Sequence, residues 1–195
     1  FTYQFSTTSS LLAGSGVHAF AEGTGAAAQF NYPTGIVRDA SGNFFVADRD
    51  NHRIRKITPA GVVTTFARSG EAGFVNGTAT AAQFNQPYGI TMDGSGNLCV
   101  ADRINHAIRK ITAAGVVTTI AGNGTAGTAN GTGAAASFWE PLNLAVDASG
   151  NIFVADYRNY VIRKITPAGV VSTFAGTISN AGFNNGTGTA ASFSG

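Results

Sequence analysis

The sequence predicts an all-β fold built from repeated antiparallel sheets, and two observations lead to this prediction. The first is internal repetition: Phe30, Phe84 and Phe138 open segments that are 54 residues apart and share most of their residues. Self-similarity at a fixed period of this size indicates a repeat architecture. The second is the pattern inside each repeat, where short apolar runs alternate with turn residues rich in Gly, Asn and Asp, which is typical of strands.

The first half of a repeat contains two expected strands, as residues 84–137 illustrate. The first strand is expected over 87–93, where a Pro/Gly turn leads into an apolar run. Residues 93–97 form a turn, because Asp accepts backbone hydrogen bonds and Gly supplies a positive φ. The second strand is expected over 98–102, a short apolar run that ends in an aspartate.

The second half of the repeat contains two more. The third strand is expected over 107–112, where Ile108 and Ile111 face inward on either side of a basic pair, and the fourth over 116–121, after a turn at 113–115. Four short strands joined by tight turns make one antiparallel sheet. Such a sheet, repeated and packed face to face around an axis, is the blade of a β-propeller.

The motif Pro-x-Gly-Ile-x-x-Asp-x-Ser-Gly-Asn-x-x-Val-Ala-Asp-x-x-Asn-x-x-Ile-Arg-Lys-Ile-Thr resembles the NHL repeat, a family of propeller blades. The resemblance covers residues 30–193 as three copies, and residues 9–29 resemble the tail of an earlier copy. It implies one propeller domain of four-stranded blades. We expect this domain to divide into a partial blade (outer strand and connecting loop) at 1–29 and full blades at 30–83, 84–137 and 138–195.

One departure from the motif concerns its glycine. Gly35 and Gly89 are replaced by Asn143 in the third copy. Asn is the residue that most readily takes the place of Gly at left-handed backbone angles. The substitution therefore predicts a left-handed turn at this position.

Composition limits the classes of function. Charged residues make up 11% of the chain, against a usual ~25%, and the net charge of +2 is too small to indicate a polyanionic partner. No apolar run approaches the ~20 residues that a membrane-spanning helix needs. The single cysteine, Cys99, aligns with Phe45 and Phe153 in an apolar strand, so we expect a small buried hydrophobe.

Three blades and a partial one are too few for a closed ring, because propellers have about four to eight blades. Two apolar faces would then remain uncovered. We expect other copies of the chain, or a longer parent chain, to complete the ring. Two copies would supply six blades, whereas an association that does not close would give a filament. The isolated monomer is accordingly not expected to be stable.

A binding face is predicted where the copies differ most. The turns between the second and third strands and the connections between blades lie on one side of a propeller, and variable loops on a rigid scaffold suit recognition. Drift on a solvated surface explains the variation equally well. The residues expected on this face are Tyr32, Arg49, His52, Gln86, Tyr88, Arg103, His106, Trp139, Glu140, Tyr157 and Tyr160.

The carboxylates argue against catalysis. Six aspartates recur in every copy and are expected to cap turns or to pair with Arg55, Arg109 and Arg163; they are Asp39, Asp93, Asp147, Asp48, Asp102 and Asp156. The others, Glu22, Asp50, Glu71 and Glu140, are expected to be free, and no two are close in sequence. Acid–base catalysis by carboxylates needs a pair in different environments, so no catalytic residue is predicted.

Metal and cofactor sites are not predicted either. His52 and His106 are equivalent, but Tyr160 replaces the third copy's histidine, and zinc needs three or four converging ligands. The glycines near 70–77 lack the Lys-Ser/Thr and the strand-to-helix context of a phosphate loop.

Nucleic acid is a disfavoured partner. Some NHL propellers bind single-stranded RNA on a basic face. Half of the twelve basic residues here are the Arg-Lys pairs of the third strands, and only Arg49, Arg53, Arg103 and Arg158 join the predicted face. An RNA-binding surface normally has a denser basic stripe.

The sequence thus favours a non-enzymatic NHL-repeat propeller that acts as a self-assembling or binding scaffold, with a protein or glycan as the ligand. Its uncharged loops rich in Thr, Gly and Asn lead us to expect an extracellular or cell-surface location. Two alternatives remain open: a lactonase- or lyase-like enzyme with a site on the propeller axis, and an RNA-binding NHL module.

Overall fold

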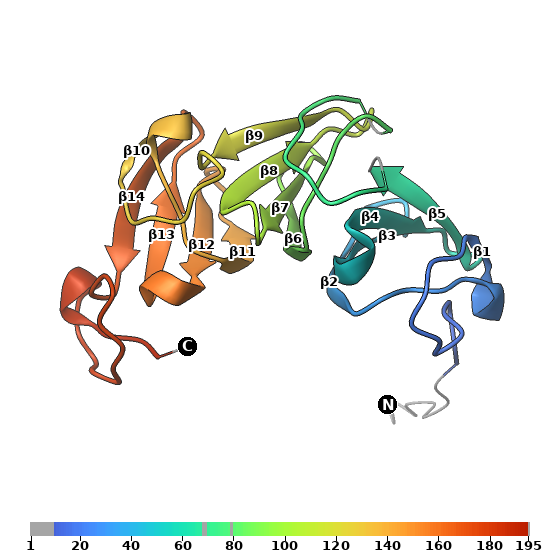
Figure 1. Cartoon of the computed structure of the whole chain (residues 1–195), viewed down its shortest axis with the longest axis horizontal. Helices are drawn as coiled ribbons and strands as arrows, with labels where there is room; N and C mark the ends of the chain where they lie inside the picture. The colour runs from blue at the N-terminus through green and yellow to red at the C-terminus, as the bar shows by residue number, and fades with distance from the viewer. Residues whose placement is uncertain (1–9, 68–69, 79, 195) are drawn as a thin grey trace, which may run out of the picture.

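The structure is a computed structural model that describes residues 10–67, 70–78 and 80–194 and places them in three antiparallel sheets. The sheets follow one another along an arc, and the first and third sheets lie on opposite sides of its open mouth (Figure 1). The predicted all-β fold of propeller blades is confirmed. The arc does not close into a ring.

The middle blade, blade 2, has the four strands that its turn residues predict. They are β6 (Pro87–Met92), β7 (Leu98–Asp102), β8 (Ala107–Ile111) and β9 (Val117–Ala121), paired in that order. The first turn forms as expected: the carboxylate of Asp93 accepts hydrogen bonds from the backbone nitrogens of Ser95 and Asn97, and Gly96 has φ +79°. The chain reverses at this turn because an Asx cap and a glycine follow each other.

Blades 1 and 3 repeat this order. Blade 1 contains β2 (Pro33–Arg38), β3 (Phe44–Asp48), the 3-10 turn η2 (Arg49–Asn51), β4 (Arg53–Ile57) and β5 (Val62–Ala67). Blade 3 contains β11 (Pro141–Val146), β12 (Ile152–Asp156), the 3-10 turn η4 (Tyr157–Asn159), β13 (Val161–Ile165) and β14 (Val170–Ala175).

Two of the sheets have a fifth strand that the sequence pattern did not predict. The two-residue strand β1 (Gly23–Thr24) pairs with β5, and β10 (Gly131–Thr132) pairs with β14. In blade 2 a single bridge between Gly77 and Val117 takes this place. The connection before each blade therefore runs along its outer edge. The predicted division into domains stays a prediction.

The 3-10 turns η1 (Gly25–Ala27) and η3 (Gly133–Ala135) lie in these connections, and η5 (Gly188–Ala190) lies in the segment after blade 3. In the described part of the chain no helix is both long and apolar enough to cross a membrane.

The core lies between blades. Each sheet has a leading face, which meets the preceding blade, and a trailing face, which meets the following one. At the first junction Phe45, Ala47 and Ile54 of blade 1 pack against Phe84 and Ile90 of blade 2. A matching cluster joins blades 2 and 3. Along the inner edge the first strands β2, β6 and β11 contact one another in turn.

The glycine at the inner edge has a different role from the predicted one. Gly35 and Gly89 lie inside strands β2 and β6, and neither they nor Asn143 have a positive φ. A Cβ on Gly35 would lie 2.6 Å from the carbonyl oxygen of Tyr88, and one on Gly89 would lie 2.5 Å from that of Leu142. The prediction of a left-handed turn is therefore wrong. Glycine is needed here because neighbouring blades approach backbone to backbone.

Candidate functional site

The turns between the second and third strands lie beside the start of the first strand in every blade. The backbone nitrogens of Asp50, Ile104 and Arg158 donate to the carbonyl oxygens of Asn31, Asn85 and Trp139, respectively, each at 3.1 Å. We call the side of the arc formed by these turns and strand starts the turn rim. It holds the predicted set Tyr32, Arg49, His52, Gln86, Arg103, His106, Trp139, Glu140, Tyr157 and Tyr160, while Tyr88 follows inside β6.

Six residues of the turn rim have left-handed backbone angles although none is glycine. Three directly precede a first strand, and three end the turns; they are Tyr32, Gln86, Glu140, His52, His106 and Tyr160, with φ between 50° and 57°. Such conformations cost energy and persist only where the surroundings impose them. Because they recur in all three blades, they belong to the architecture of the blade.

The two histidines connect neighbouring blades. Nδ1 of His52 accepts a hydrogen bond from the backbone nitrogen of Gln86, and Nδ1 of His106 accepts one from that of Glu140, both at 3.1 Å. Burial lowers the pKa of His52, against the opposing charge of Asp50, and lowers the pKa of His106, against that of Glu140. Both rings are therefore held neutral, as hydrogen-bond acceptors.

An ion pair also crosses the second junction. Nη2 of Arg103 lies 2.6 Å from Oε2 of Glu140, and Nε of Arg158 lies 3.7 Å from the same oxygen. Partial burial favours the protonated carboxyl, but the hydrogen bonds and charge of Arg103 outweigh it and lower the pKa of Glu140. Arg103 thus anchors the strand start of the next blade.

The prediction that Glu140, Asp50 and Glu22 are free carboxylates is wrong. Asp50 pairs with Arg49 at 2.7 Å, and Glu22 accepts a hydrogen bond from the backbone nitrogen of Thr65 at 2.8 Å. The guanidinium of Arg49 also lies over the ring of Tyr32, 4.7 Å from its centroid. Charges on the turn rim are thus largely neutralised by contacts within the chain.

The recurrent aspartate at the end of the second strand forms a buried ion pair with arginine, as predicted. In blade 2, Nη1 of Arg109 lies 2.7 Å from Oδ2 of Asp102, and neither side chain is exposed. Arg109 also donates to the carbonyl oxygens of Gln83 and Val75 in the preceding connection. The pairs Arg55–Asp48 and Arg163–Asp156 repeat this contact at 2.9 Å. The motif therefore ties each connection to its sheet.

A raised carboxyl pKa often marks an acid–base catalyst. Burial raises the pKa of Asp102 to about 6, in spite of Arg109 and Asn105. Its Oδ2 accepts from both of those side chains and its Oδ1 from the backbone nitrogen of Asn85. The side chain is fully covered, so this carboxylate serves the fold and no substrate reaches it.

Metal-ligating residues do not gather in threes anywhere in the described part of the chain. Cys99 is buried, and desolvation raises the pKa of its thiol to about 11. It packs in the junction between blades 2 and 3, as its position in an apolar strand predicted.

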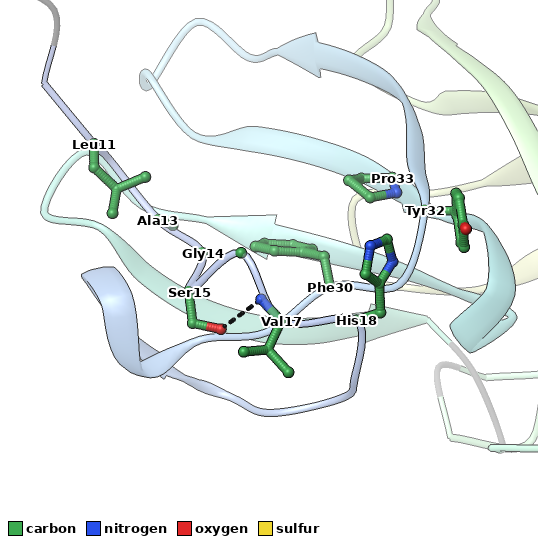
Figure 2. A pocket seen from close by; sticks show the side chains of 10 residues that line it. Leu11, Ala13, Gly14, Ser15, Val17, His18, Phe30, Tyr32 and Pro33 are labelled. Atoms are coloured by element: carbon green, nitrogen blue, oxygen red, sulfur yellow. Dashed lines mark hydrogen bonds between the residues drawn. The ribbon is translucent and has the colours of Figure 1, made fainter.

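The leading face of blade 1 is a second candidate site that the sequence did not nominate. Two hollows lie on it, of about 400 and 250 Å³, and both are lined by Ala13, Phe30 and Pro33. Figure 2 shows the larger one, where the ring of Phe30 lies between Gly14 and the pair His18 and Tyr32. Ile36, Val46 and Ile57 line the smaller hollow. Val46 and Ile57 are already buried, so Ile36 is the exposed residue among the three. The alignment of Ile36 with the apolar residues Ile90 and Leu144 was the signal in the sequence that could have revealed this face.

The trailing face of blade 3 has no further described blade against it and is covered only in part, by the segment that follows β14. A hollow of about 240 Å³ there is lined by Ala155, Ile162, Tyr157 and Tyr160, together with Phe193. Phe174 on the same blade is 53% exposed. Tyr157 and Tyr160 thus lie where the turn rim meets an open blade face.

Comparison with known proteins identifies the repeat. The NHL repeat family matches residues 30–57 and 84–111. Protein SUPPRESSOR OF QUENCHING 1, chloroplastic, from Arabidopsis thaliana is 36% identical over 91 residues, which are 46% of this chain and 9% of that protein. Two of the three repeats therefore match the NHL repeat, and the stretch matched spans about a tenth of the length of this relative.

Solved structures share the fold at low sequence identity. An auxiliary nutrient binding protein from Bacteroides thetaiotaomicron matches with a TM-score of 0.66 and 16% identity, over 86% of this chain and 42% of that one. A catalytically inactive virginiamycin B lyase from Staphylococcus aureus, with quinupristin, matches with a TM-score of 0.53 and 16% identity, over 73% and 40% of the two chains. The chain thus spans about two-fifths of each.

Proposed function

We propose that this chain is a non-catalytic scaffold, which assembles with further propeller blades through its uncovered blade faces and presents the turn rim for binding. One contrast carries the proposal. Ile36 on the leading face of blade 1 is 61% exposed, whereas its equivalents Ile90 and Leu144 are 6% and 7% exposed. Burying such a side chain stabilises an interface by about 1.5–3 kcal/mol. Covering this face with another blade would therefore be energetically favourable.

The chemistry of the carboxylates supports a scaffold over an enzyme. All six recurrent aspartates have structural tasks: three cap turns by accepting backbone hydrogen bonds, and three form buried ion pairs with arginine. Asp50 and Glu140 are paired with arginines on the turn rim. The arrangement favours contact surfaces over proton transfer. A protein or glycan ligand and an extracellular location stay predictions.

The mass of the particle in solution tests the proposal. We expect sedimentation equilibrium at micromolar concentration to give a mass above the 19.8 kDa of one chain. Ile36→Lys should return the protein to the mass of one chain, because association would bury an unpaired ammonium. The matched control is Val116→Lys: Val116 is 37% exposed and lies next to β9 of the middle blade, on neither terminal blade. A compact wild-type monomer at all concentrations would contradict the proposal.

A further inference from the structure

A cavity lies in the junction between blades 2 and 3, at the end of the sheets opposite the turn rim. Its volume is about 490 Å³, and the turns that follow β6 and β11 line it together with residues of β7, β8 and β9. Cys99 and Ile152 are the most buried residues of the lining, at 2% and 6% exposure. The cavity is therefore built into a packed junction and is separate from both the turn rim and the uncovered face of blade 1.

The cavity lies where the second junction lacks two aromatic rings of the first. At the first junction the rings of Phe45 and Phe66 pack edge to face at the apolar cluster between the blades, with their centroids 4.8 Å apart. The equivalent residues of blade 2 are Cys99 and Ile120, and both line the cavity. Replacing a large side chain by a small one leaves a void where the surroundings do not collapse. The cavity thus occupies the place of the missing rings.

Lys110 lacks the ring that its equivalents cover. In the other two blades the ammonium group of the equivalent lysine lies over a phenylalanine ring, 6.0 and 5.8 Å from the centroid; the pairs are Lys56–Phe45 and Lys164–Phe153. In blade 2 the strand position opposite Lys110 is held by Cys99, and Nζ of Lys110 lies 3.5 Å from Oδ2 of Asp93 instead. A ring bound in the cavity would give this ammonium group the aromatic face that it has in the other blades.

The size of the cavity suits a small molecule. An apolar cavity of about 150 Å³ is large enough for benzene, and sites for small molecules usually measure about 300–1,000 Å³. The volume of about 490 Å³ therefore accommodates one aromatic ring with a short substituent.

The charges in the lining disfavour an anionic ligand. The lining contains two carboxylates, of Asp93 and Asp147, against one ammonium group, of Lys110, so its net charge is negative at neutral pH. Ser95 and Ser149 also line the cavity, and their hydroxyl groups can form hydrogen bonds with an uncharged polar substituent.

We propose that this cavity binds a small, uncharged aromatic molecule. The ring of the ligand takes the place of the missing phenylalanine rings and lies under the ammonium group of Lys110, and its polar substituent points toward the serines of the turns. The site goes beyond the proposed function, because it lies inside a junction that the chain forms within itself. Binding therefore does not require assembly with further blades.

Fluorine NMR of para-fluorobenzyl alcohol, titrated with the protein, tests the site. We expect the fluorine signal to shift and to saturate as one site fills at millimolar concentration or below. Cys99→Phe restores the residue type of the other two copies and fills the cavity, so it should raise the dissociation constant by roughly tenfold or more. Ile120→Phe, which fills the cavity from β9, should have the same effect. Thermal unfolding checks that both variants fold.

Two lysine variants test the position of the ring. Lys110→Met removes the ammonium group and should raise the dissociation constant of the probe by roughly two- to fivefold. Lys56→Met is the matched control, because Lys56 is the equivalent residue of blade 1 and lies over Phe45, away from the cavity; it should leave the constant unchanged. Cyclohexylmethanol, which has no aromatic face, should compete equally well for the wild type and for Lys110→Met.

Each outcome decides part of the proposal. Absence of saturable binding to the wild type at millimolar concentration would overturn the site, and so would binding that survives both phenylalanine variants. Tighter binding of para-fluorobenzoate than of the alcohol would overturn the assignment of an uncharged ligand. Equal effects of the two lysine variants would overturn stacking against Lys110. None of these results bears on the mass of the particle in solution, which tests the proposed function separately.

Discussion

Gly35 and Gly89 show how a single missing side chain determines the distance between blades. Both lie in extended strands, and a Cβ on either would meet the backbone of the next blade at 2.6 Å or less. A neighbouring backbone cannot move aside as a flexible side chain can. The close spacing of the inner strands therefore requires a residue without a Cβ at both positions.

We expect Gly35→Ala and Gly89→Ala each to lower the free energy of unfolding by about 1–3 kcal/mol, as overpacking does. Gly94→Ala is the matched control, because its Cβ would meet nothing within 4 Å and its φ is not in the left-handed region. Urea titration of the three variants measures the difference. Equal stabilities would mean that the blades do not approach as closely as described.

The sequence reveals that position 143 departs from the repeat, but not the reason. Comparison of the copies gives Gly, Gly and Asn, and left-handed geometry is the most common explanation of such a change. The cause lies instead in the following blade, which the pattern of a single repeat does not contain. Likewise, the ion pair of Glu140 with Arg103 joins residues 37 positions apart, and only the packing of two blades brings them together.

At the scale of elements, the strands were predictable because the turns between them contain recognisable turn residues, Asp, Asn and Gly. The turn at Asp93 to Asn97 and the buried pair Asp102–Arg109 both follow from residues that every copy retains. The strands β1 and β10 were not predictable, because two residues of Gly-Thr carry no alternation of apolar and polar side chains.

Arg109 of the buried ion pair should contribute far more to the free energy of unfolding than Lys110, the next residue on β8. Arg109→Met leaves the carboxylate of Asp102 buried without its charge partner, which we expect to cost about 3–5 kcal/mol of unfolding free energy. Lys110→Met removes a partly exposed contact of 3.5 Å to Asp93 and should change stability by at most about 0.5 kcal/mol. Denaturant unfolding of both variants tests this, and similar losses would contradict the structural role of the motif.

The junctions should weaken in mild acid. In the unfolded chain His52 and His106 take up protons near their ordinary pKa of about 6.5, whereas in the folded chain burial lowers the pKa of both rings. Their contribution to stability is therefore complete above about pH 6.5 and is lost as the pH falls through the lowered values. Asp50 and Arg53 face His52, and Glu140 faces His106.

We expect the unfolding free energy to fall more steeply between about pH 7.5 and 5 in the wild type than in the double variant His52→Asn, His106→Asn. Asparagine tolerates the left-handed backbone angle of both positions and does not titrate. Urea unfolding at a series of pH values measures both slopes. Parallel curves would show that the histidines are not the groups that respond to pH.

At the scale of the whole molecule, the chain is an arc with two unlike ends (Figure 1). The sequence predicted an incomplete ring, because three repeats fall short of the number that closes. The sequence did not identify which faces are left uncovered. The aromatic pair Phe153–Phe174 and the exposed Ile36 can be recognised as interface residues only by comparison with the packed junctions between blades. The predicted instability of the monomer stays a prediction.

The central claim is that the leading face of blade 1 becomes covered when the protein assembles. Thiol labelling of an Ile36→Cys variant over a range of protein concentrations measures this directly, because the native Cys99 is buried and burial raises its pKa to about 11, so it reacts slowly. We expect labelling at position 36 to be fast in dilute solution and to slow as the particle forms. Fast labelling that does not change with concentration would contradict the account.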